Sequence, residues 1–514
     1  MPARALTALQ HRHPLLSMPP PQNQPSVRHA VAYSLSQSGI AFVVSLVTSM
    51  IVARLLTPKE TGVFALAAAA VAVGGFLREF GLGDYLISQK TVTPQKLRVA
   101  FTLNLAIGWS VAALLWLLAE PLARWYAEPS LTRVVHVLCV NFVLVPFGIT
   151  AVAMLSKAMR FGRIFVLQTT SLLVGAIVTV WGALAGHSSL SLALGSAASS
   201  LTVVLMLLLL QPGTVFHRPT LQGLREALRF GGALTLTRLL DSVTKNSSDF
   251  IVSANLGFSA GGLWSKSSSL VGSFHDFFLT AVSRVATPAF TRARQQALGI
   301  REPYLHATVL VATAQWSFFA LLVVFADEVV HLLFGPSWLA CVPVLQILAI
   351  GAMLWAPVSL SFSALTSRQA VRQQLQIQLL YTPLAVLGLL VGAAHSLEAM
   401  AGLFSAARLL RLLHTGRAMQ QVFGISLADV AARLDVSAAV VVTAATVGAI
   451  VKATLLAQGL APWQVLAGGV AAALVVGVGV SLHLKHPLVI EAKRLLRRRF
   501  GLGAPANTVS ASGG

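Results

Sequence analysis

Charged residues are scarce in this sequence. Asp, Glu, Lys and Arg make up only 10% of its 514 residues, whereas an ordinary soluble domain has about 25%. Acidic residues are the rarer charged type, with 16 Asp and Glu against 37 Lys and Arg, while apolar residues reach 56%. This composition excludes an ordinary soluble domain and is typical of a membrane protein.

Cysteine and catalytic motifs are also nearly absent. The two cysteines, Cys139 and Cys341, both fall within long apolar runs, so they are more often packing residues than metal ligands, and a disulfide framework is not expected. The sequence has no Gly-rich run ending in Gly-Lys-Ser/Thr, no His-Glu-x-x-His and no nucleophile elbow. We expect neither an enzyme nor a bound cofactor.

Long apolar runs are what the sequence has instead. Runs of roughly 20 residues recur between residues 30 and 482, and each can cross a hydrocarbon core of about 30 Å. We therefore predict an all-α, polytopic membrane protein with about 14 transmembrane helices. The predicted spans lie near residues 31–56, 62–80, 97–119, 132–155, 164–185, 189–210, 231–256, 260–283, 304–326, 339–365, 375–393, 397–419, 436–457 and 463–483.

Basic residues favour one side of this predicted topology. Most Lys and Arg residues fall in the tails and in the alternate loops on the side of the N-terminus. The opposite loops carry only Arg54, Lys59, Arg124 and Arg133. Four more basic residues are counted within the spans: Arg238, Lys245, Lys266 and Lys452. This bias predicts that both termini are cytoplasmic.

The sequence repeats itself. Leu56-Thr57 with Gly62 resembles Leu256-Gly257 with Gly262, at an offset of 200, and residues 119–130 resemble residues 326–337 at an offset of 207. The repeat unit is six spans, and an even number of spans returns the chain to the same side. We therefore predict two parallel six-helix lobes around a central cleft, followed by two C-terminal helices.

The domain boundaries follow from this repeat. Leu221, Leu224 and Leu228 share one helix face between the lobes, which indicates an amphipathic helix on the membrane surface or an ordinary linker helix. Met18 could be the true start. The basic tail lacks interleaved aromatic residues, so anionic lipid is its expected partner and nucleic acid is not. The predicted parts are 1–29 (disordered cytoplasmic tail), 30–210 (N-lobe), 211–230 (amphipathic linker), 231–420 (C-lobe), 421–484 (spans 13 and 14) and 485–514 (basic cytoplasmic tail).

The seventh predicted span carries four charges on one face: Arg238, Asp241, Lys245 and Asp249. On a helix they fall within an arc of roughly 80° over about 16 Å of length. Charges at hydrocarbon depth are costly, so they line a polar path or pair with a partner. Their spacing also allows pairing within the row. We favour a polar cleft, and pairing that locks this helix to a neighbour is the alternative.

Two further spans add polar residues to the expected cleft. Span eight carries Lys266, Ser269, Ser273 and Asp276 on one stripe. Span one carries Ser34, Ser38, Ser45 and Ser49. The candidate binding residues are therefore Arg238, Lys245, Lys266, Asp241, Asp249, Asp276, Ser38 and Ser45. Arg78 and Glu79 at the end of span two, with His275 in span eight, are candidates for a gate or for an ion pair at a helix end.

Several short motifs resemble one known family. They are Leu55-Leu56-Thr57-Pro58-Lys59-Glu60-Thr61-Gly62-Val63-Phe64, Phe80-Gly81-Leu82-Gly83, Leu86-Ile87-Ser88-Gln89-Lys90, Arg124-Trp125-Tyr126-Ala127-Glu128-Pro129, Met159-Arg160-Phe161, Gly262-Leu263-Trp264-Ser265-Lys266, Pro288-Ala289-Phe290 and Phe334-Gly335-Pro336-Ser337-Trp338. In this order they resemble the Wzx-like polysaccharide transporters of the multidrug/oligosaccharidyl-lipid/polysaccharide exporter superfamily. The resemblance covers residues 30–420. Trp264 stands where tyrosine is usual, and Thr366-Ser367 precede Arg368 where a glycine is common.

The resemblance implies a function. Such proteins flip undecaprenyl-diphosphate-linked oligosaccharide repeat units across the bacterial inner membrane by alternating access, for exopolysaccharide or lipopolysaccharide synthesis. Arg238 and Lys245 would then hold the diphosphate, while Asp241 and Asp249 balance their charge in an empty cleft. An ion gradient or the membrane potential would supply the energy. Expected partners are the lipid-linked oligosaccharide, membrane lipids, and the polymerase and glycosyltransferases of the same pathway.

Two other functions remain open. A drug/cation antiporter of the same superfamily would use the acidic residues of the cleft to bind an organic cation. The three basic and three acidic candidates in the cleft do not decide between an anionic and a cationic substrate. A membrane scaffold of a glycan synthesis complex would need no transport at all.

Overall fold

The computed structural model describes residues 27–79, 86, 92–220, 242–244, 246–295, 299–368 and 370–489. Every regular element in these ranges is a helix, which confirms the all-α prediction. The first ten are α2 (Val27–Leu55), α3 (Pro58–Glu79), α5 (Pro94–Trp125), α6 (Ser130–Leu144), α7 (Pro146–Lys157), α8 (Phe161–Leu184), α9 (Leu190–Leu210), α10 (Pro212–Val215), α12 (Gly257–Gln295) and α13 (Arg301–Val324). The others are α14 (Ala326–Leu333), η1 (Pro336–Cys341), α15 (Val342–Trp355), η2 (Ala356–Val358), α16 (Ser361–Ser367), α17 (Val371–Ala393), α18 (Leu397–Phe423), α19 (Leu427–Ala457) and α20 (Pro462–His483).

Many of these helices can cross a membrane. Within the described ranges, nine are long and apolar enough, or ten if α6 and α7 form one bent span. Predicted spans 62–80, 260–283 and 397–419 coincide with α3, α12 and α18, which are long but carry charged side chains. The predicted span 231–256 lies partly outside the described residues, although 246–255 are helical. The chain is a multi-pass membrane protein, and the count of fourteen spans stays a prediction.

The fourth predicted span is bent at Pro146. α6 ends at Leu144, α7 begins at Pro146, and the two helices meet at an angle of 48°. Proline has no backbone N–H to continue the preceding helix, but it is well suited to the first turn of a new one. The sequence therefore fixes both the end of α6 and the start of α7.

Side-chain caps define the starts of several helices. Before α3, the Thr57 backbone N–H donates to Glu60 Oε2 at 2.8 Å, and the Glu60 N–H donates to Thr57 Oγ1 at 3.3 Å. Ser426 and Asp429 make the same reciprocal pair before α19. Such capping boxes satisfy two backbone donors that the first helical turn leaves without partners.

The chain divides into two compact units. The first unit comprises residues 1–284, 330–351 and 371–411, and the second comprises residues 285–329, 352–370 and 412–514. Both units are assembled from segments that are distant in sequence, so α12, α14, α15 and α18 each contribute to both. The predicted N-lobe and C-lobe boundaries stay predictions.

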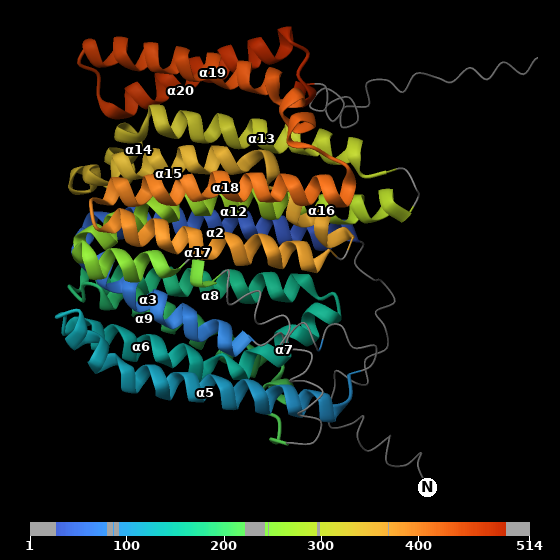
Figure 1. Ribbon diagram of the computed structural model, residues 1–514. Coiled ribbons are helices and arrows are strands. Elements are labelled where there is room, and N and C mark those ends of the chain that lie inside the picture. Colours follow the sequence, from blue (N-terminus) through green and yellow to red (C-terminus); the bar gives the residue numbers. More distant parts are fainter. Residues whose placement is uncertain are drawn as a thin grey trace, which may run out of the picture. The chain divides into compact units, whose positions relative to one another are not determined.

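Small residues let helices of the first unit approach closely. α8 and α9 lie side by side (Figure 1). A Cβ added at Gly195 of α9 would lie 1.7 Å from Thr179 Oγ1 and 2.7 Å from the Gly175 carbonyl oxygen of α8. Close packing of this kind is typical of helix pairs in lipid, where association depends on van der Waals contact rather than on escape from water.

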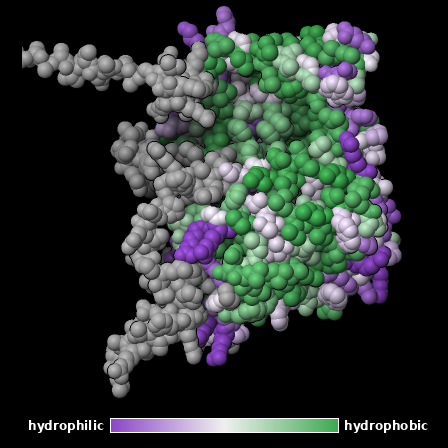
Figure 2. Space-filling view, turned by 180° about the vertical axis from the view of Figure 1, so that it is seen from behind, coloured by the Kyte–Doolittle hydropathy of each residue, from purple (hydrophilic) through white to green (hydrophobic). Residues whose placement is uncertain are grey.

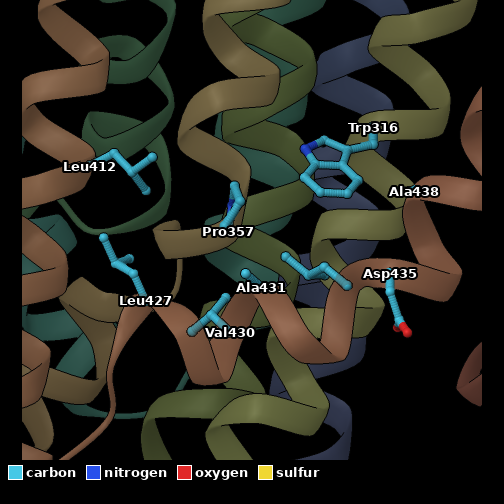
Figure 3. Close-up of a pocket in the computed structure, with 9 residues that line it drawn as sticks. Trp316, Pro357, Leu412, Leu427, Val430, Ala431, Asp435 and Ala438 are labelled. Atoms are coloured by element: carbon cyan, nitrogen blue, oxygen red, sulfur yellow. The ribbon is translucent and has the colours of Figure 1, made fainter.

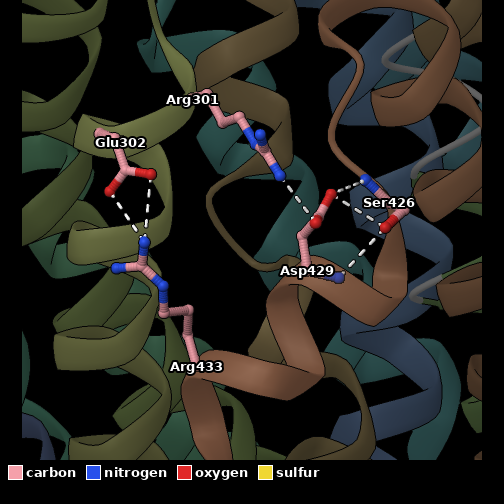
Figure 4. A network of polar contacts seen from close by, with 5 residues as sticks. All are labelled: Arg301, Glu302, Ser426, Asp429 and Arg433. Carbon is pink, nitrogen blue, oxygen red and sulfur yellow. Dashed lines mark hydrogen bonds and ion pairs between the residues drawn. The ribbon is translucent and has the colours of Figure 1, made fainter.

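In the second unit α13 and α19 run parallel. Arg301 pairs with Asp429 at 2.7 Å, and Glu302 accepts from Arg433 at 3.1 Å (Figure 4). The partners are separated in sequence by 128 and 131 residues. Because this separation is nearly constant along the pair, the two helices point the same way, as expected for spans an even number apart.

A half-buried cation fixes the other end of the same helix pair. Lys452 of α19 donates to the Val324 carbonyl oxygen at 2.8 Å and pairs with Glu328 at 2.9 Å and Asp327 at 3.6 Å. The Glu328 side chain is only 4% exposed. Lys452, which the sequence places within a span, therefore has its counter-charges at the start of α14.

Apolar side chains cover much of the described surface. Leu117, Trp125, Leu209 and Val475 are each more than 70% exposed. Figure 2 shows hydrophobic residues over most of the face drawn there, with hydrophilic residues gathered toward its edges. In water such a surface would be costly. It is the surface expected of helices that face lipid.

Candidate functional site

The polar stripes of α2 and α12 face each other in the first unit and enclose a cavity of about 430 Å³. The stripe on α2 includes Ser38, Ser45 and Ser49, and its members recur at the three- and four-residue spacing of one helix face. The cavity is lined by Ser38, Ala41, Phe42, Ser45, Leu46, Ser49, Lys266, Ser269, Leu270, Ser273, Asp276, Phe277 and Phe334.

Lys266 is the cation of this lining. It is only 8% exposed, and its Nζ donates to Ser49 Oγ at 2.8 Å and to the Ser49 carbonyl oxygen at 3.4 Å. Its Nζ also lies 5.2 Å from the centre of the Phe334 ring and 5.5 Å from that of Trp338. Ring faces attract a cation more strongly where water is excluded. The ammonium group is therefore held by groups that carry no formal charge.

The segment around Trp338 also holds α2. Trp338 is fully buried, and its Nε1 donates to the Ala53 carbonyl oxygen at 2.7 Å. Arg54 donates to the Leu332 carbonyl oxygen at 2.8 Å. The Trp338 bond satisfies a carbonyl group in the last turn of α2, where carbonyl groups lack partners within the helix. In the other bond an arginine side chain of the same turn is the donor. The end of α2 near Lys266 is thereby fixed by side-chain contacts from two directions.

The opposite part of the cavity is acidic and aromatic. Asp276 lies ten residues, about 15 Å of helix, beyond Lys266 on α12. Phe277 next to it stacks on Phe42 of α2, with ring centres 5.3 Å apart. The cavity thus has its cation at one end, its carboxylate toward the other, and serine hydroxyls between them.

A second cavity has a mostly apolar lining. It lies in the second unit, measures about 310 Å³, and has Asp435 as its one charged lining residue (Figure 3). Asp435 is exposed and lies at the edge of the group that Figure 3 shows. The residues that line it are Trp316, Pro357, Leu412, Leu427, Val430, Ala431, Leu434, Asp435 and Ala438. It offers little to a sugar or a diphosphate, whose polar groups need hydrogen-bond partners.

The structure brings together four of the predicted binding residues: Lys266, Asp276, Ser38 and Ser45. Their role in binding stays a prediction. Arg238, Asp241 and Lys245 lie outside the described residues. Asp249 is described. Its Oδ1 is buried and accepts no hydrogen bond from the described residues.

The predicted gate is described only in part. Arg78 and Glu79 belong to the last turn of α3, and their side chains lie outside the described part. His275 is half-buried on α12 beside Asp276 and is not among the residues that line the cavity. The predicted linker helix over residues 221–228 lies outside the described residues as well.

Two groups of residues were not predicted from the sequence. Phe334 and Trp338 surround Lys266, but their approach depends on a contact between distant parts of the chain. Arg408 and Arg411 lie at the middle of α18, so the count of four basic residues within spans is too low. Arg411 lies over the Tyr381 ring at 4.6 Å. A check of each span for mid-helix arginine would have found this second group.

One carboxylate outside the spans has a shifted pKa. Glu128 lies in the turn between α5 and α6. Burial raises its pKa, but hydrogen bonding from Ser130 and the ion pair with Lys59, at 3.0 Å, outweigh burial and leave the pKa below its ordinary value.

Within the described residues, no group of three or more His, Cys, Asp or Glu side chains could hold a metal ion.

Comparison with known proteins identifies the family. The family described as "Polysaccharide biosynthesis protein" matches residues 51–343, more than half of the chain. The chain belongs to this family. The resemblance seen in the sequence is thereby confirmed at the level of the family.

Two curated relatives share part of the sequence. Lipopolysaccharide biosynthesis protein WzxC of Escherichia coli is 24% identical over 337 residues, which cover 64% of this chain and 68% of WzxC. Succinoglycan biosynthesis transport protein ExoT of Rhizobium meliloti is 28% identical over 351 residues, which cover 66% of this chain and 69% of ExoT.

Two solved structures share the fold. A structure of the lipid II flippase MurJ in an inward closed conformation matches with a TM-score of 0.71, covering 89% of this chain and all of MurJ at 11% identity. An inward-facing multidrug transporter of the MATE family matches with a TM-score of 0.55, covering 77% of this chain and 94% of that one at 14% identity. At these identities the likeness describes the fold alone.

Proposed function

We propose that this chain flips diphosphate-linked oligosaccharide repeat units from the cytoplasmic to the periplasmic leaflet of the bacterial inner membrane. The cavity between α2 and α12 takes the polar head of this lipid, and the prenyl chain stays in the bilayer. Transport proceeds by alternating access, with both termini of the chain in the cytoplasm. Membership of the polysaccharide biosynthesis family and the likeness to WzxC and ExoT support this proposal.

The observation that carries the proposal is the setting of Lys266. A diphosphate can leave water only if charge-assisted hydrogen bonds replace its hydration. Lys266 Nζ faces no described carboxylate within ion-pair distance and instead contacts Ser49 and two aromatic rings. An anion in the cavity would therefore compete with a hydroxyl and a carbonyl group, not with a fixed negative charge.

Serine hydroxyls suit the sugar part of the same cargo. Ser38, Ser45, Ser269 and Ser273 line the cavity with groups that both donate and accept hydrogen bonds. The rings of Phe42 and Phe277 present apolar faces to the same space. Hydroxyl groups and ring faces together match the mixed polar and apolar surface of a sugar.

The repeat extends this reasoning to the seventh span. Four cavity-lining residues of α2 have counterparts in the charged row at an offset of 200. The α2 residues are Ser38, Ala41, Ser45 and Ser49, and their counterparts are, in the same order, Arg238, Asp241, Lys245 and Asp249. If the two halves are parallel copies, the charged row occupies the matching face of its own lobe. Arg238 and Lys245 are then further ligands of the diphosphate.

Asp276 supports a second candidate function. An exposed carboxylate in a polar cavity could bind an organic cation, as a drug/cation antiporter requires. Such a protein would depend on Asp276 and tolerate loss of Lys266. A glycan flippase would show the reverse dependence, so Asp276→Asn and Lys266→Gln separate the two functions.

The proposal is tested in cells that lack the native gene. Deletion should stop surface polysaccharide production and leave lipid-linked repeat units in the cytoplasmic leaflet. Wild-type protein should restore export, Asp276→Asn should restore most of it, and Lys266→Gln should fail at normal membrane abundance. Loss of drug resistance with normal polysaccharide in the deletion strain would favour the antiporter. Accumulation of repeat units in the periplasmic leaflet would exclude flipping by this chain.

A further inference from the structure

Two glycines bring α3 and α12 into direct backbone contact. A Cβ added at Gly62 would lie 1.8 Å from the Phe258 carbonyl oxygen, and one added at Gly262 would lie 1.9 Å from the Pro58 carbonyl oxygen. Carbonyl oxygens belong to the helix backbone and cannot rotate aside as a side chain can. Any larger residue at either position must therefore push the two helices apart.

The contact is symmetric with respect to the repeat. Gly62 contacts Phe258, while Gly262 contacts Pro58. Gly62 and Gly262 are counterparts at the offset of 200, and so are Pro58 and Phe258, so exchanging the two halves converts one contact into the other. The same motif from the two halves thus packs against itself. We call this contact, made by residues 58–62 and 258–262, the glycine seam.

The glycine seam lies just past the cationic end of the cavity. Gly262 precedes Lys266 by four residues, about one helical turn of α12. On the other side, α2 ends at Leu55, shortly before the start of α3 at Pro58, and its last turn is held by Trp338 and Arg54. Backbone contact at this level leaves no space between α3 and α12 for cargo to pass.

We propose that Gly62 and Gly262 are positioning residues that close the cargo cavity at its Lys266 end, and that the glycine seam parts in each transport cycle. This inference rests on the proposed function, since a protein that moves no cargo needs no such closure. Glycine is required because only backbone contact closes the end completely. Weak van der Waals contact without hydrogen bonds across the seam also lets it reopen.

The test uses one reporter cysteine in the cavity. Ser269→Cys lies one turn from Lys266 on the cavity lining, in a chain whose two buried cysteines are changed to alanine. An impermeant thiol reagent probes it from outside in whole cells and from the cytoplasmic side in inside-out vesicles. With both glycines intact, labelling should be strong from the cytoplasmic side and weak from outside.

Alanine at either seam position should shift this balance. In Gly62→Ala or Gly262→Ala, labelling from outside should rise severalfold, while labelling from the cytoplasmic side falls. Gly75→Ala in α3 and Gly272→Ala in α12 are matched controls, because a Cβ at these positions meets no described atom within 4 Å. The controls should label as the parent chain does.

Opposite changes on the two sides are the decisive signature. If alanine only loosens the protein, labelling will rise from both sides. If alanine is tolerated at the seam, labelling will stay the same from both sides. Either result would overturn the proposal. Labelling needs no cargo. A failure of Lys266 variants to affect export would therefore contradict the proposed function while leaving the seam result standing.

A second measurement leaves the glycines in place, in case the alanine variants do not reach the membrane. Lys59 and Ser259 are exposed residues within the seam and are counterparts at the same offset of 200. Spin labels on Lys59→Cys and Ser259→Cys should give a short and a long distance, and their proportions should change with diphosphate-linked cargo. One unchanging short distance in a transporting protein would overturn the proposal.

Discussion

Lys266 of α12 donates a 2.8 Å hydrogen bond to Ser49 Oγ of α2, and this bond joins the two helices that line the polar cavity. At an offset of 200, Ser49 is the counterpart of Asp249 on the seventh span. The first half of the chain thus supplies a hydroxyl where the second half supplies a carboxylate. Under the proposed function, this difference leaves Lys266 available to an anionic cargo.

We expect the stability of the purified protein to depend on pH through His486. Its imidazole is fully buried after the end of α20, with Nε2 3.0 Å from Ser437 Oγ, while the Leu488 N–H donates to Nδ1 at 3.1 Å. Burial lowers the pKa of His486 below its ordinary value. The neutral ring is therefore the form that the fold holds.

The sign of the effect follows from this lowered pKa. The stabilisation is complete above the unfolded pKa of about 6.5 and is lost as the pH falls through the lower folded pKa. The melting temperature in detergent should fall between about pH 7.5 and pH 5, and His486→Gln should reduce that fall. The exposed His483 provides the control His483→Gln. An identical pH profile for the parent chain and His486→Gln would contradict the assignment.

The pair of half-buried Lys452 and buried Glu328 should behave differently from exposed pairs. Lys452→Met alone leaves a buried carboxylate without its partner, which costs about 3–5 kcal/mol, whereas replacing both residues by apolar ones is often nearly neutral. Lys452→Met should lower the melting temperature, and adding Glu328→Leu should restore most of it. Glu302→Gln, which breaks the exposed pair with Arg433, should cost about 0–1 kcal/mol. If the melting temperature falls equally in Lys452→Met and in the double variant, the ion pair is not the stabilising contribution of these residues.

Much of the cavity could be predicted from the sequence. The serines of α2 and the Lys266 to Asp276 stripe of α12 recur at the helical period, so spacing alone assigns each set to one helix face. The repeat added the expectation that these faces meet. Phe334 and Trp338 could not be placed near Lys266, because nothing local in the sequence encodes a contact across about seventy residues.

Hydropathy alone does not identify every helix that coincides with a predicted span. α12 and α18 coincide with predicted spans, yet Lys266 and Asp276 in one, and Arg408 and Arg411 in the other, lower their hydropathy. A helix that faces a polar cavity or pairs with aromatic rings does not need to be apolar all round. A hydropathy threshold alone therefore leaves out α12 and α18, although the apolar runs of the sequence predicted a span at each. The glycine seam also needed three-dimensional contact to be recognised, although both motifs were visible in the sequence.

The charged row of the seventh span gives a third prediction. Arg238→Ala or Lys245→Ala should abolish or cripple polysaccharide export at normal membrane abundance, because a lost charge-assisted contact to phosphate costs about 1.5–3 kcal/mol, or about ten- to a hundredfold in affinity. Arg238→Lys should be milder, though it loses the bidentate fork. If the row only pairs with itself, Lys245→Ala combined with Asp249→Ala will recover abundance and export. That recovery would contradict a role for Arg238 and Lys245 in binding the cargo.

Topology gives a fourth prediction. The distribution of basic residues predicts that the segments at residues 120–131 and 327–338 face the periplasm. In a chain without its native cysteines, Ser130→Cys and Ser337→Cys should react with an impermeant thiol reagent in whole cells. A cysteine placed at the exposed Arg417, on the opposite side, should react only in inside-out vesicles. The reverse pattern would invert the topology.

The most direct test of the central claim is flipping by the purified protein in lipid vesicles. The measured quantity is the rate at which a polyprenyl-diphosphate-linked oligosaccharide crosses the bilayer, for the wild-type chain and for Lys266→Gln and Lys266→Arg. The wild-type chain should flip this lipid, and Lys266→Gln should slow it about ten- to a hundredfold through the lost charged contact, with Lys266→Arg intermediate because it keeps the charge. Folded wild-type protein that leaves the lipid in its original leaflet, or equal rates for wild type and Lys266→Gln, would contradict this account.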